Sequence, residues 1–155
     1  MIELRELQPY LDQEKLKPLL DIVSVLTEFE AVDRNNFQQV LTDQSHREIL
    51  CAELVARLGF LTEFEQIEFN SFTADLEVRF RSERRLAGDK TTEGAVKAFV
   101  ESSPEYKIKL LALKALSTFS TFVVSLKFTH IHRGEIAQRF VELERAHYSS
   151  DRRAT

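Results

Sequence analysis

The sequence predicts an all-α protein: a helical bundle with one long C-terminal helix, which we expect to be packed in an oligomer. Turn-forming residues are scarce, with 4 glycines and 3 prolines in 155 residues. Few turn-formers mean few turns and long elements, and long elements are helices. Apolar residues also recur at helical spacing through most of the chain. No hairpin turn separates the apolar stretches, so no segment is predicted as a strand.

The length is that of one domain, since domains commonly run to about 100–150 residues. We therefore predict a single domain over residues 1–148 and a flexible tail over 149–155. Within the domain, acidic helices are expected over 10–78 and a basic part over 79–147. Met1–Pro9 is expected to form an arm or a short turn before the first helix.

The first helix is predicted from Asp12, which can serve as its N-cap, to the polar cluster Asp33–Asn36. Leucines and valines recur at helical spacing between these two signals. A short helix is expected to follow around Phe37–Leu41.

A long helix is predicted next. Ser45 and Glu48 fit a capping box, in which each side chain satisfies a free backbone amide of the other's turn. Apolar residues then continue at helical spacing to the turn signal at Gly88–Asp89. Gly59 lies inside this stretch and costs about 1 kcal/mol relative to alanine, so a kink or break is expected there.

Two further helices follow in the sequence. Thr91 or Thr92 is expected to cap a short helix. The run Ser103–Glu105 is the strongest start signal in the chain, because it joins a capping serine, a proline at the first helical position and a glutamate. It predicts a last helix to about His147, broken or bent near Gly134.

Charge is distributed unevenly along the chain. The net charge is −4. Residues 1–78 hold 6 Lys/Arg and 16 Asp/Glu, whereas residues 79–139 hold 12 and 6. Such asymmetry is a signal of a partner, and it could also attract a second copy head-to-tail.

Residues 106–134 contain no carboxylate, and a cluster of arginines precedes them. Surfaces of this kind bind phosphate backbones, and nearby aromatic rings stack on the bases of single-stranded DNA. The alternative is a solvated face whose basic side chains pair with the acidic half. The predicted nucleic-acid site comprises Arg79, Arg81, Arg84, Arg85, Lys90, Lys107, Lys114 and, for stacking, Tyr106.

The last helix is apolar on more than one face, which predicts that it is covered on more than one face. A second copy of the chain would supply that cover; the alternative is a central helix wrapped by its own chain. The predicted oligomer interface comprises Leu110, Leu113, Leu116, Phe119, Val123 and Leu126.

No catalytic or metal site is predicted. The sequence has no glycine-rich phosphate loop, no paired-cysteine zinc spacing and no HExxH pattern. His130 and His132 would point about 200° apart on a helix, and the single cysteine, Cys51, is expected to be a buried thiol. We therefore expect no enzyme activity and no cofactor. No leader and no membrane-spanning run are seen, so a cytoplasmic protein without membrane contact is expected.

The second half carries a further pattern: Lys90–Glu93, then Val96–Val100, then Pro104–Tyr106, leading into a long helix that closes at Arg133, Ile136 and Phe140. This order is similar to that of the UvsY-like recombination mediators of tailed phages, over roughly residues 70–145. The resemblance implies a helical subunit that forms a ring and binds single-stranded DNA. Such a ring helps a RecA-like recombinase replace a single-strand-binding protein.

By that resemblance, the arginine cluster and Lys90 would track the DNA, and the helix 104–147 would supply much of the subunit contact. The expected function is that of a non-enzymatic, oligomeric accessory protein of phage-type recombination, in the bacterial host cytoplasm if it is phage-encoded. The alternative is a structural or adaptor protein, either a virion component or an inhibitor of a host protein, that acts through protein contacts alone.

Overall fold

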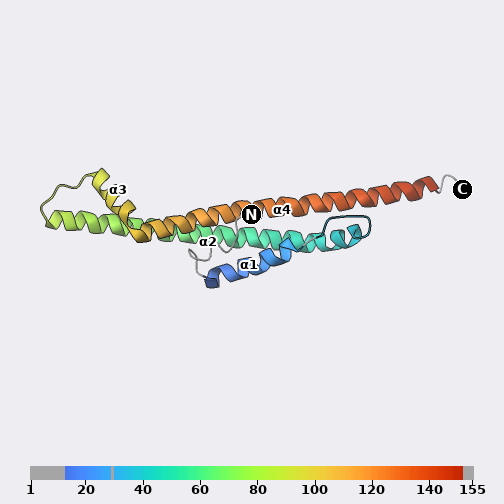
Figure 1. The fold of residues 1–155 in the computed structure, drawn as a ribbon, viewed down its shortest axis with the longest axis horizontal. Coiled ribbons are helices and arrows are strands. Elements are labelled where there is room, and N and C mark those ends of the chain that lie inside the picture. Colours follow the sequence, from blue (N-terminus) through green and yellow to red (C-terminus); the bar gives the residue numbers. More distant parts are fainter. Residues whose placement is uncertain (1–12, 29, 152–155) are drawn as a thin grey trace. The chain divides into compact units, whose positions relative to one another are not determined.

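A computed structural model describes residues 13–28 and 30–151, and within them the chain forms four helices (Figure 1). They are α1 (Gln13–Thr27), α2 (Phe37–Leu86), α3 (Glu93–Ser102) and α4 (Pro104–Asp151). No strand occurs in these residues. The predicted all-α class and the long last helix are confirmed. The expected arm Met1–Pro9 and the expected cap Asp12 lie outside the described residues.

The long helix α2 begins earlier than predicted and is continuous over 50 residues. Ser45 lies inside it, so the predicted capping box is wrong, as is the predicted break at Gly59. The turn before α2 is fixed instead by Asp33, whose Oδ1 accepts hydrogen bonds from the backbone amides of Asn35 (2.7 Å) and Asn36 (3.0 Å). Buried leucines on both sides of Gly59, among them Leu54 and Leu61, outweigh its cost of about 1 kcal/mol.

The predicted starts of α3 and α4 are confirmed. The Thr92 hydroxyl accepts a hydrogen bond from the Ala95 amide at 3.3 Å and caps α3, and α4 begins at Pro104 directly after Ser103. The predicted break at Gly134 is wrong, because α4 runs through it to Asp151. Residues 149–151 of the expected tail are therefore helical, and 152–155 lie outside the described residues.

The chain divides into two compact units, each built from segments that are distant in sequence. Of the described residues, the first unit contains 13–16 together with Leu58–Ser120, and the second contains 17–28, 30–57 and 121–151. Each unit thus combines chain from the predicted acidic part and the predicted basic part.

In the first unit, the second half of α2 lies beside α3 and the first half of α4 (Figure 1). The Phe80 and Phe99 rings stack across α2 and α3 with centroids 4.6 Å apart. The core is formed by apolar side chains from all three helices and from Leu16: Leu58, Leu61, Phe80, Val96, Val100, Ala112, Leu116 and Phe119.

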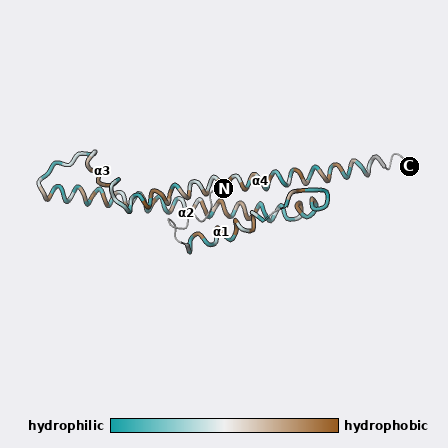
Figure 2. Tube along the Cα trace, viewed as in Figure 1, coloured by the Kyte–Doolittle hydropathy of each residue, from teal (hydrophilic) through white to brown (hydrophobic). Residues whose placement is uncertain are grey.

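In the second unit, α1 packs with the first half of α2 and the second half of α4. The Phe37 and Phe140 rings stack with centroids 5.8 Å apart. The two long helices alternate between hydrophobic and hydrophilic residues along their traces, because only part of each circumference faces a core (Figure 2). The core residues are Leu19, Val23, Leu26, Phe37, Cys51, Leu54, Val123, Leu126 and Ala137.

Candidate interaction surfaces

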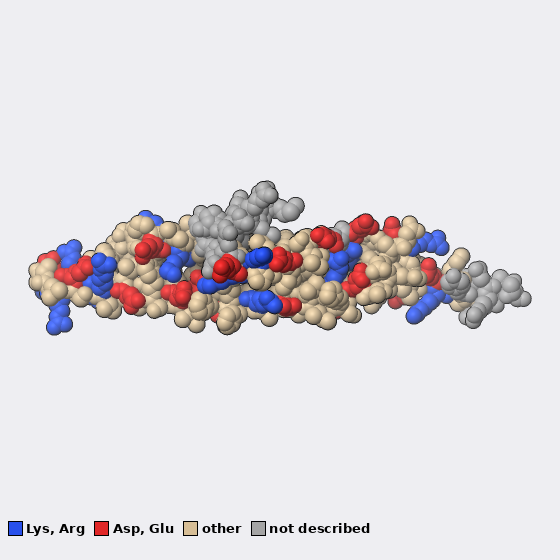
Figure 3. All heavy atoms as spheres, turned by 90° about the horizontal axis from the view of Figure 1, so that it is seen from below, with Lys and Arg blue, Asp and Glu red and all other residues tan. Residues whose placement is uncertain are grey.

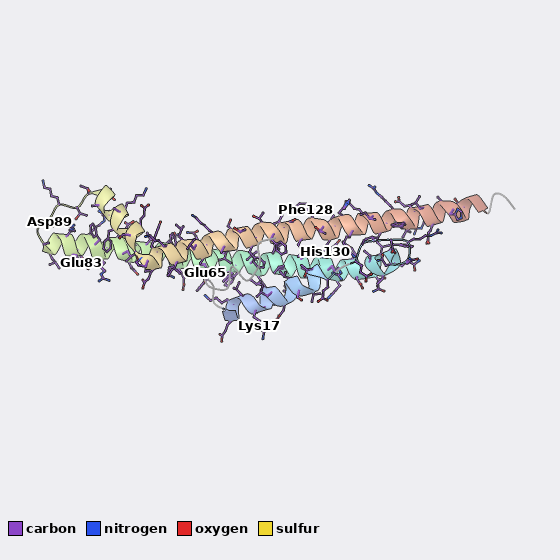
Figure 4. The ribbon with its side chains drawn as sticks, viewed as in Figure 1. Lys17, Glu65, Glu83, Asp89, Phe128 and His130 are labelled. Carbon is purple, nitrogen blue, oxygen red and sulfur yellow. The ribbon has the colours of Figure 1, made fainter. Side chains whose placement is uncertain are left out.

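Three arginines of the predicted phosphate-binding cluster are paired with carboxylates of the first unit. Arg79 Nε lies 2.9 Å from Glu83, Arg81 Nη2 lies 2.9 Å from both carboxylate oxygens of Glu93, and Arg84 Nη1 lies 2.6 Å from Asp89. Figure 4 shows the labelled Glu83 and Asp89 at the end of α2 and in the turn after it. The alternative expected such side chains to pair with the acidic half of the chain, whereas these three partners all belong to the basic part, residues 79–147.

The remaining basic side chains of the predicted site are exposed. Arg85, Lys90, Lys107 and Lys114 form no ion pair with any residue that the structure describes. On the face seen in Figure 3, basic and acidic groups lie beside one another rather than in separate fields. The predicted cluster is itself mixed, because three of its arginines lie beside carboxylates.

The Tyr106 ring, predicted to stack on bases, and the Phe80 ring beside the arginine cluster are both packed inside the first unit. Tyr106 is half-buried, and its ring lies 5.2 Å from that of Phe69 between centroids. Phe80 is buried against Phe99, with the guanidinium of Arg84 5.5 Å from its ring centre. Stacking a base on either ring would first require one of these contacts to open.

The residues of the predicted oligomer interface lie mostly in the core. Leu116, Phe119, Val123 and Leu126 are buried by the chain itself, while Leu110 and Leu113 are half-buried. The alternative of a helix wrapped by its own chain accounts for the four buried side chains. A second copy is not needed to cover them.

Large apolar side chains are instead exposed on α2 of the first unit. Phe60 is 73 % exposed and Ile67 68 %, with Phe64 and Val78 also exposed. These positions belong to one stripe with alternating spacings of four and three residues, in which the intervening members, Ser71 and Ala74, are exposed as well. We call the six residues 60, 64, 67, 71, 74 and 78 the α2 seam. Such spacing is that of the a and d positions of a coiled coil.

The α2 seam is hard to see in the sequence because α2 has apolar residues in two phases. Leu54, Leu58 and Leu61 are buried, whereas Phe60, Phe64 and Ile67 follow a similar helical spacing on an exposed side of the helix. Counting all of them as one apolar pattern conceals the second stripe. The sequence does carry a signal, because every seam position is apolar or small and all its e and g neighbours except Leu61 are acidic or amide-bearing.

A second exposed apolar stripe lies on α4 in the second unit, formed by Val124, Phe128 and Ile131. Figure 4 shows Phe128 on the side of α4 opposite to His130, which points toward α1 and α2. Phe128 is 64 % exposed, whereas His130 is buried.

A group of polar contacts surrounds the C-terminal end of α1 in the second unit. His130 Nε2 donates to the Leu26 carbonyl at 2.8 Å, and the Gln44 amide donates to the His130 carbonyl at 3.2 Å. Arg47 donates to the carbonyls of Val25 (3.2 Å) and Glu28 (3.0 Å), and Arg133 donates to that of Glu30. We call this set the carbonyl cluster.

Burial is the main cause that lowers the pKa of His130, and the positive charges of Arg47 and Arg133 lower it further, against the hydrogen bond to Leu26. An open pocket of about 430 Å³ adjoins the cluster and is lined in part by Gln39, Asp43 and both arginines. The guanidinium groups already donate to backbone carbonyls, so the cluster's geometry is that of a structural contact.

Cys51 is buried, and burial is the main cause that raises the pKa of its thiol. The expectation of a buried cysteine is confirmed. Within the described part of the chain, no group of three or more His, Cys, Asp or Glu side chains is placed to hold a metal ion.

One stretch of α4 within Pro104–His147 is long and apolar enough to cross a membrane, judged by length and composition alone. Only 22 % of that stretch is buried. Core helices of soluble proteins meet the same criteria, so this is weak support for a membrane span. The absence of membrane contact stays a prediction.

Comparison of the chain with protein-family models, with curated proteins and with solved structures finds no match. The resemblance to the UvsY-like mediators therefore stays a prediction.

Proposed function

We propose that this chain is a non-enzymatic helical interaction protein that acts through protein–protein contacts made by its exposed apolar helix faces. The α2 seam is the observation that carries the proposal. Exposed apolar residues scattered singly are ordinary on protein surfaces, but a contiguous apolar stripe with polar flanks is typical of an interaction site. A side chain such as Phe60, left 73 % exposed, gains free energy when a partner covers it.

The pairing of the arginine cluster also favours protein contacts over nucleic acid. A phosphate that binds Arg81 or Arg84 has to displace a carboxylate that already occupies the guanidinium. The rings that would stack on bases are packed against other aromatic residues. In the α2 seam, Phe64 lies under the Lys15 ammonium, 4.8 Å from its ring centre, while Phe60 and Ile67 remain 73 % and 68 % exposed.

The second candidate function is that of a single-stranded-DNA-binding accessory protein, which would contact a recombinase or a single-strand-binding protein. Four exposed basic side chains support it: Arg85, Lys90, Lys107 and Lys114. Exposed ion pairs also contribute only about 0–1 kcal/mol, so a polyanion can displace the carboxylates from the paired arginines.

Affinity capture from the cells that make the protein tests the proposal. The tagged chain is compared with the double variant Phe60→Ser/Ile67→Ser and with the control Leu86→Ser/Leu143→Ser. The control removes two apolar side chains of comparable exposure that lie outside the seam. We expect a protein partner that the unchanged chain and the control retain and the seam variant loses. The same set of bound proteins in all three samples would contradict the proposal.

Fluorescence anisotropy with a labelled single-stranded oligonucleotide separates the two candidates. Under the proposal, the chain shows no binding at low salt. Binding that falls steeply with added salt, and that is lost in Arg85→Glu/Lys90→Glu, would instead establish the second candidate.

A further inference from the structure

The α2 seam has acidic flanks on both sides. The six seam residues occupy d and a positions in alternation, starting with Phe60 at d. The e positions beside them then include Glu68 and Asp75, and the g positions include Glu63 and Glu77. Asp75 and Glu63 are exposed and form no ion pair with the described residues, while Glu68 lies 3.9 Å from Lys109. Residues at e and g decide which helix a coiled-coil face accepts.

The seam does not suit a second seam. In a parallel pair the g position of one helix faces the e position of the other, and in an antiparallel pair g faces g and e faces e. Either arrangement would place carboxylates opposite carboxylates, and like charges across an interface are unfavourable. The partner helix therefore has to bring an apolar stripe with basic flanks.

The first unit itself carries such a stripe, at the start of α4. Ile108 is 52 % exposed and Leu111 44 %, and Ala115 and Thr118 continue the same spacing of three and four residues. Lys107 and Lys114 lie along one flank of this stripe, seven residues apart, and both are exposed. We call these six residues the α4 lysine stripe.

We propose that the α2 seam binds the α4 lysine stripe of a second copy of this chain. Lys107 and Lys114 have the seven-residue spacing of Glu68 and Asp75, so both lysines meet carboxylates when the two helices lie in register. The apolar residues of each stripe fill the contact, and the charges select this pairing over seam with seam. The proposal rests on the proposed function and names the partner of the same surface.

The contact differs from the oligomer interface that the sequence predicted. Leu116 and Phe119, at the centre of that prediction, are covered by the chain's own core. Ile108 and Leu111 lie on the same helix but on an exposed side of it, so the second copy covers surface that its own chain leaves open.

Sedimentation equilibrium of the full chain tests the proposal. A contact of two to three heptads is small, so we expect self-association with a Kd on the order of 10 µM. Two charge reversals, Lys107→Glu/Lys114→Glu and Glu68→Lys/Asp75→Lys, should each weaken it at least about tenfold. An equimolar mixture of the two variants should associate again, because an acidic α4 stripe then meets a basic α2 flank.

The matched control is Lys17→Glu/Arg139→Glu, which changes the net charge as the first reversal does but lies outside both stripes; it should associate like the unchanged chain. A chain that stays monomeric to about 200 µM, a reversal without effect, or a mixture that fails to associate would each overturn the proposal. A monomeric chain whose seam still captures another protein would leave the proposed function in place and sink only this inference.

Discussion

The arginines of the two units bind different acceptors. In the first unit, Arg81 and Arg84 pair with carboxylates at the surface, between segments that are close in sequence. In the second unit, Arg47 reaches from α2 to backbone carbonyls of Val25 and Glu28, and Arg133 reaches from α4 to that of Glu30. The arginines of the first unit connect segments that are close in sequence. Those of the second unit connect α2 and α4 to the end of α1 and the segment after it.

The difference follows from the end of α1. The last carbonyls of a helix have no partner inside the helix and form the negative end of its dipole. α1 has no basic residue in its last turn, and the cation that reaches one of its last carbonyls, that of Val25, comes from α2. Arg133 of α4 binds the carbonyl of Glu30, in the segment after α1. Whether an arginine forms a surface ion pair or a contact between helices thus depends on which unsatisfied acceptor the fold places near its guanidinium.

Replacing Arg47 by methionine should give the largest effect on this comparison. The variant keeps the apolar stem and removes the hydrogen bonds to Val25 in α1 and to Glu28 just after it. Because the donor is charged, this should lower the free energy of unfolding by about 2 kcal/mol. Urea denaturation followed by circular dichroism measures the change. The control Arg145→Met, at an exposed position, should change the free energy of unfolding by no more than about 0.5 kcal/mol. An equal loss of unfolding free energy in both variants would show that the carbonyl cluster does not stabilise the fold.

The buried histidine makes the second unit sensitive to pH. Because burial lowers the pKa of folded His130, the unfolded chain binds more protons below the ordinary value of about 6.5, and stability falls as the pH drops from there toward the folded pKa. The loss is at most about 1.4 kcal/mol per pH unit. His130→Gln, which keeps a donor for Leu26 and does not titrate, should flatten the pH dependence of the unfolding free energy below about pH 6.5. An unchanged slope would contradict this role of His130.

The sequence predicted the helix starts that depend on local signals well. It predicted poorly the features that depend on packing between helices. Thr92 and Ser103–Pro104 are local signals, so the starts of α3 and α4 were correct. Ser45 and Gly59 were read as interruptions because the local rules do not include the packing that carries α2 through them. The partners of Arg47 and Arg133 lie on helices distant in sequence, which no spacing along the chain reveals.

The glycines inside the two long helices should respond differently to alanine. A Cβ at Gly59, in the first unit, would meet nothing within 4 Å, so Gly59→Ala should raise the free energy of unfolding by about 1 kcal/mol. A Cβ at Gly134, in the second unit, would come within 2.8 Å of the Gln44 side chain, whose amide donates to the His130 carbonyl. Displacing that amide should cancel much of the helical gain. Equal stabilisation in thermal unfolding of the two variants would show that Gln44 moves at no cost.

Removing a surface pair of the first unit should have the smallest effect. Arg81→Met breaks its ion pair with Glu93, but the arginine and glutamate side chains are 43 % and 83 % exposed, so water and salt already screen the attraction. We expect the free energy of unfolding to fall by about 0.5 kcal/mol or less. A double-mutant cycle with Glu93→Gln should give a coupling energy of similar size. The same urea measurement that detects Arg47→Met applies here. If Arg81→Met lowered the free energy of unfolding as much as Arg47→Met, the two kinds of arginine contact would contribute equally to stability. The acceptor, a surface carboxylate or a backbone carbonyl near the end of a helix, would then not determine what an arginine contributes to this fold.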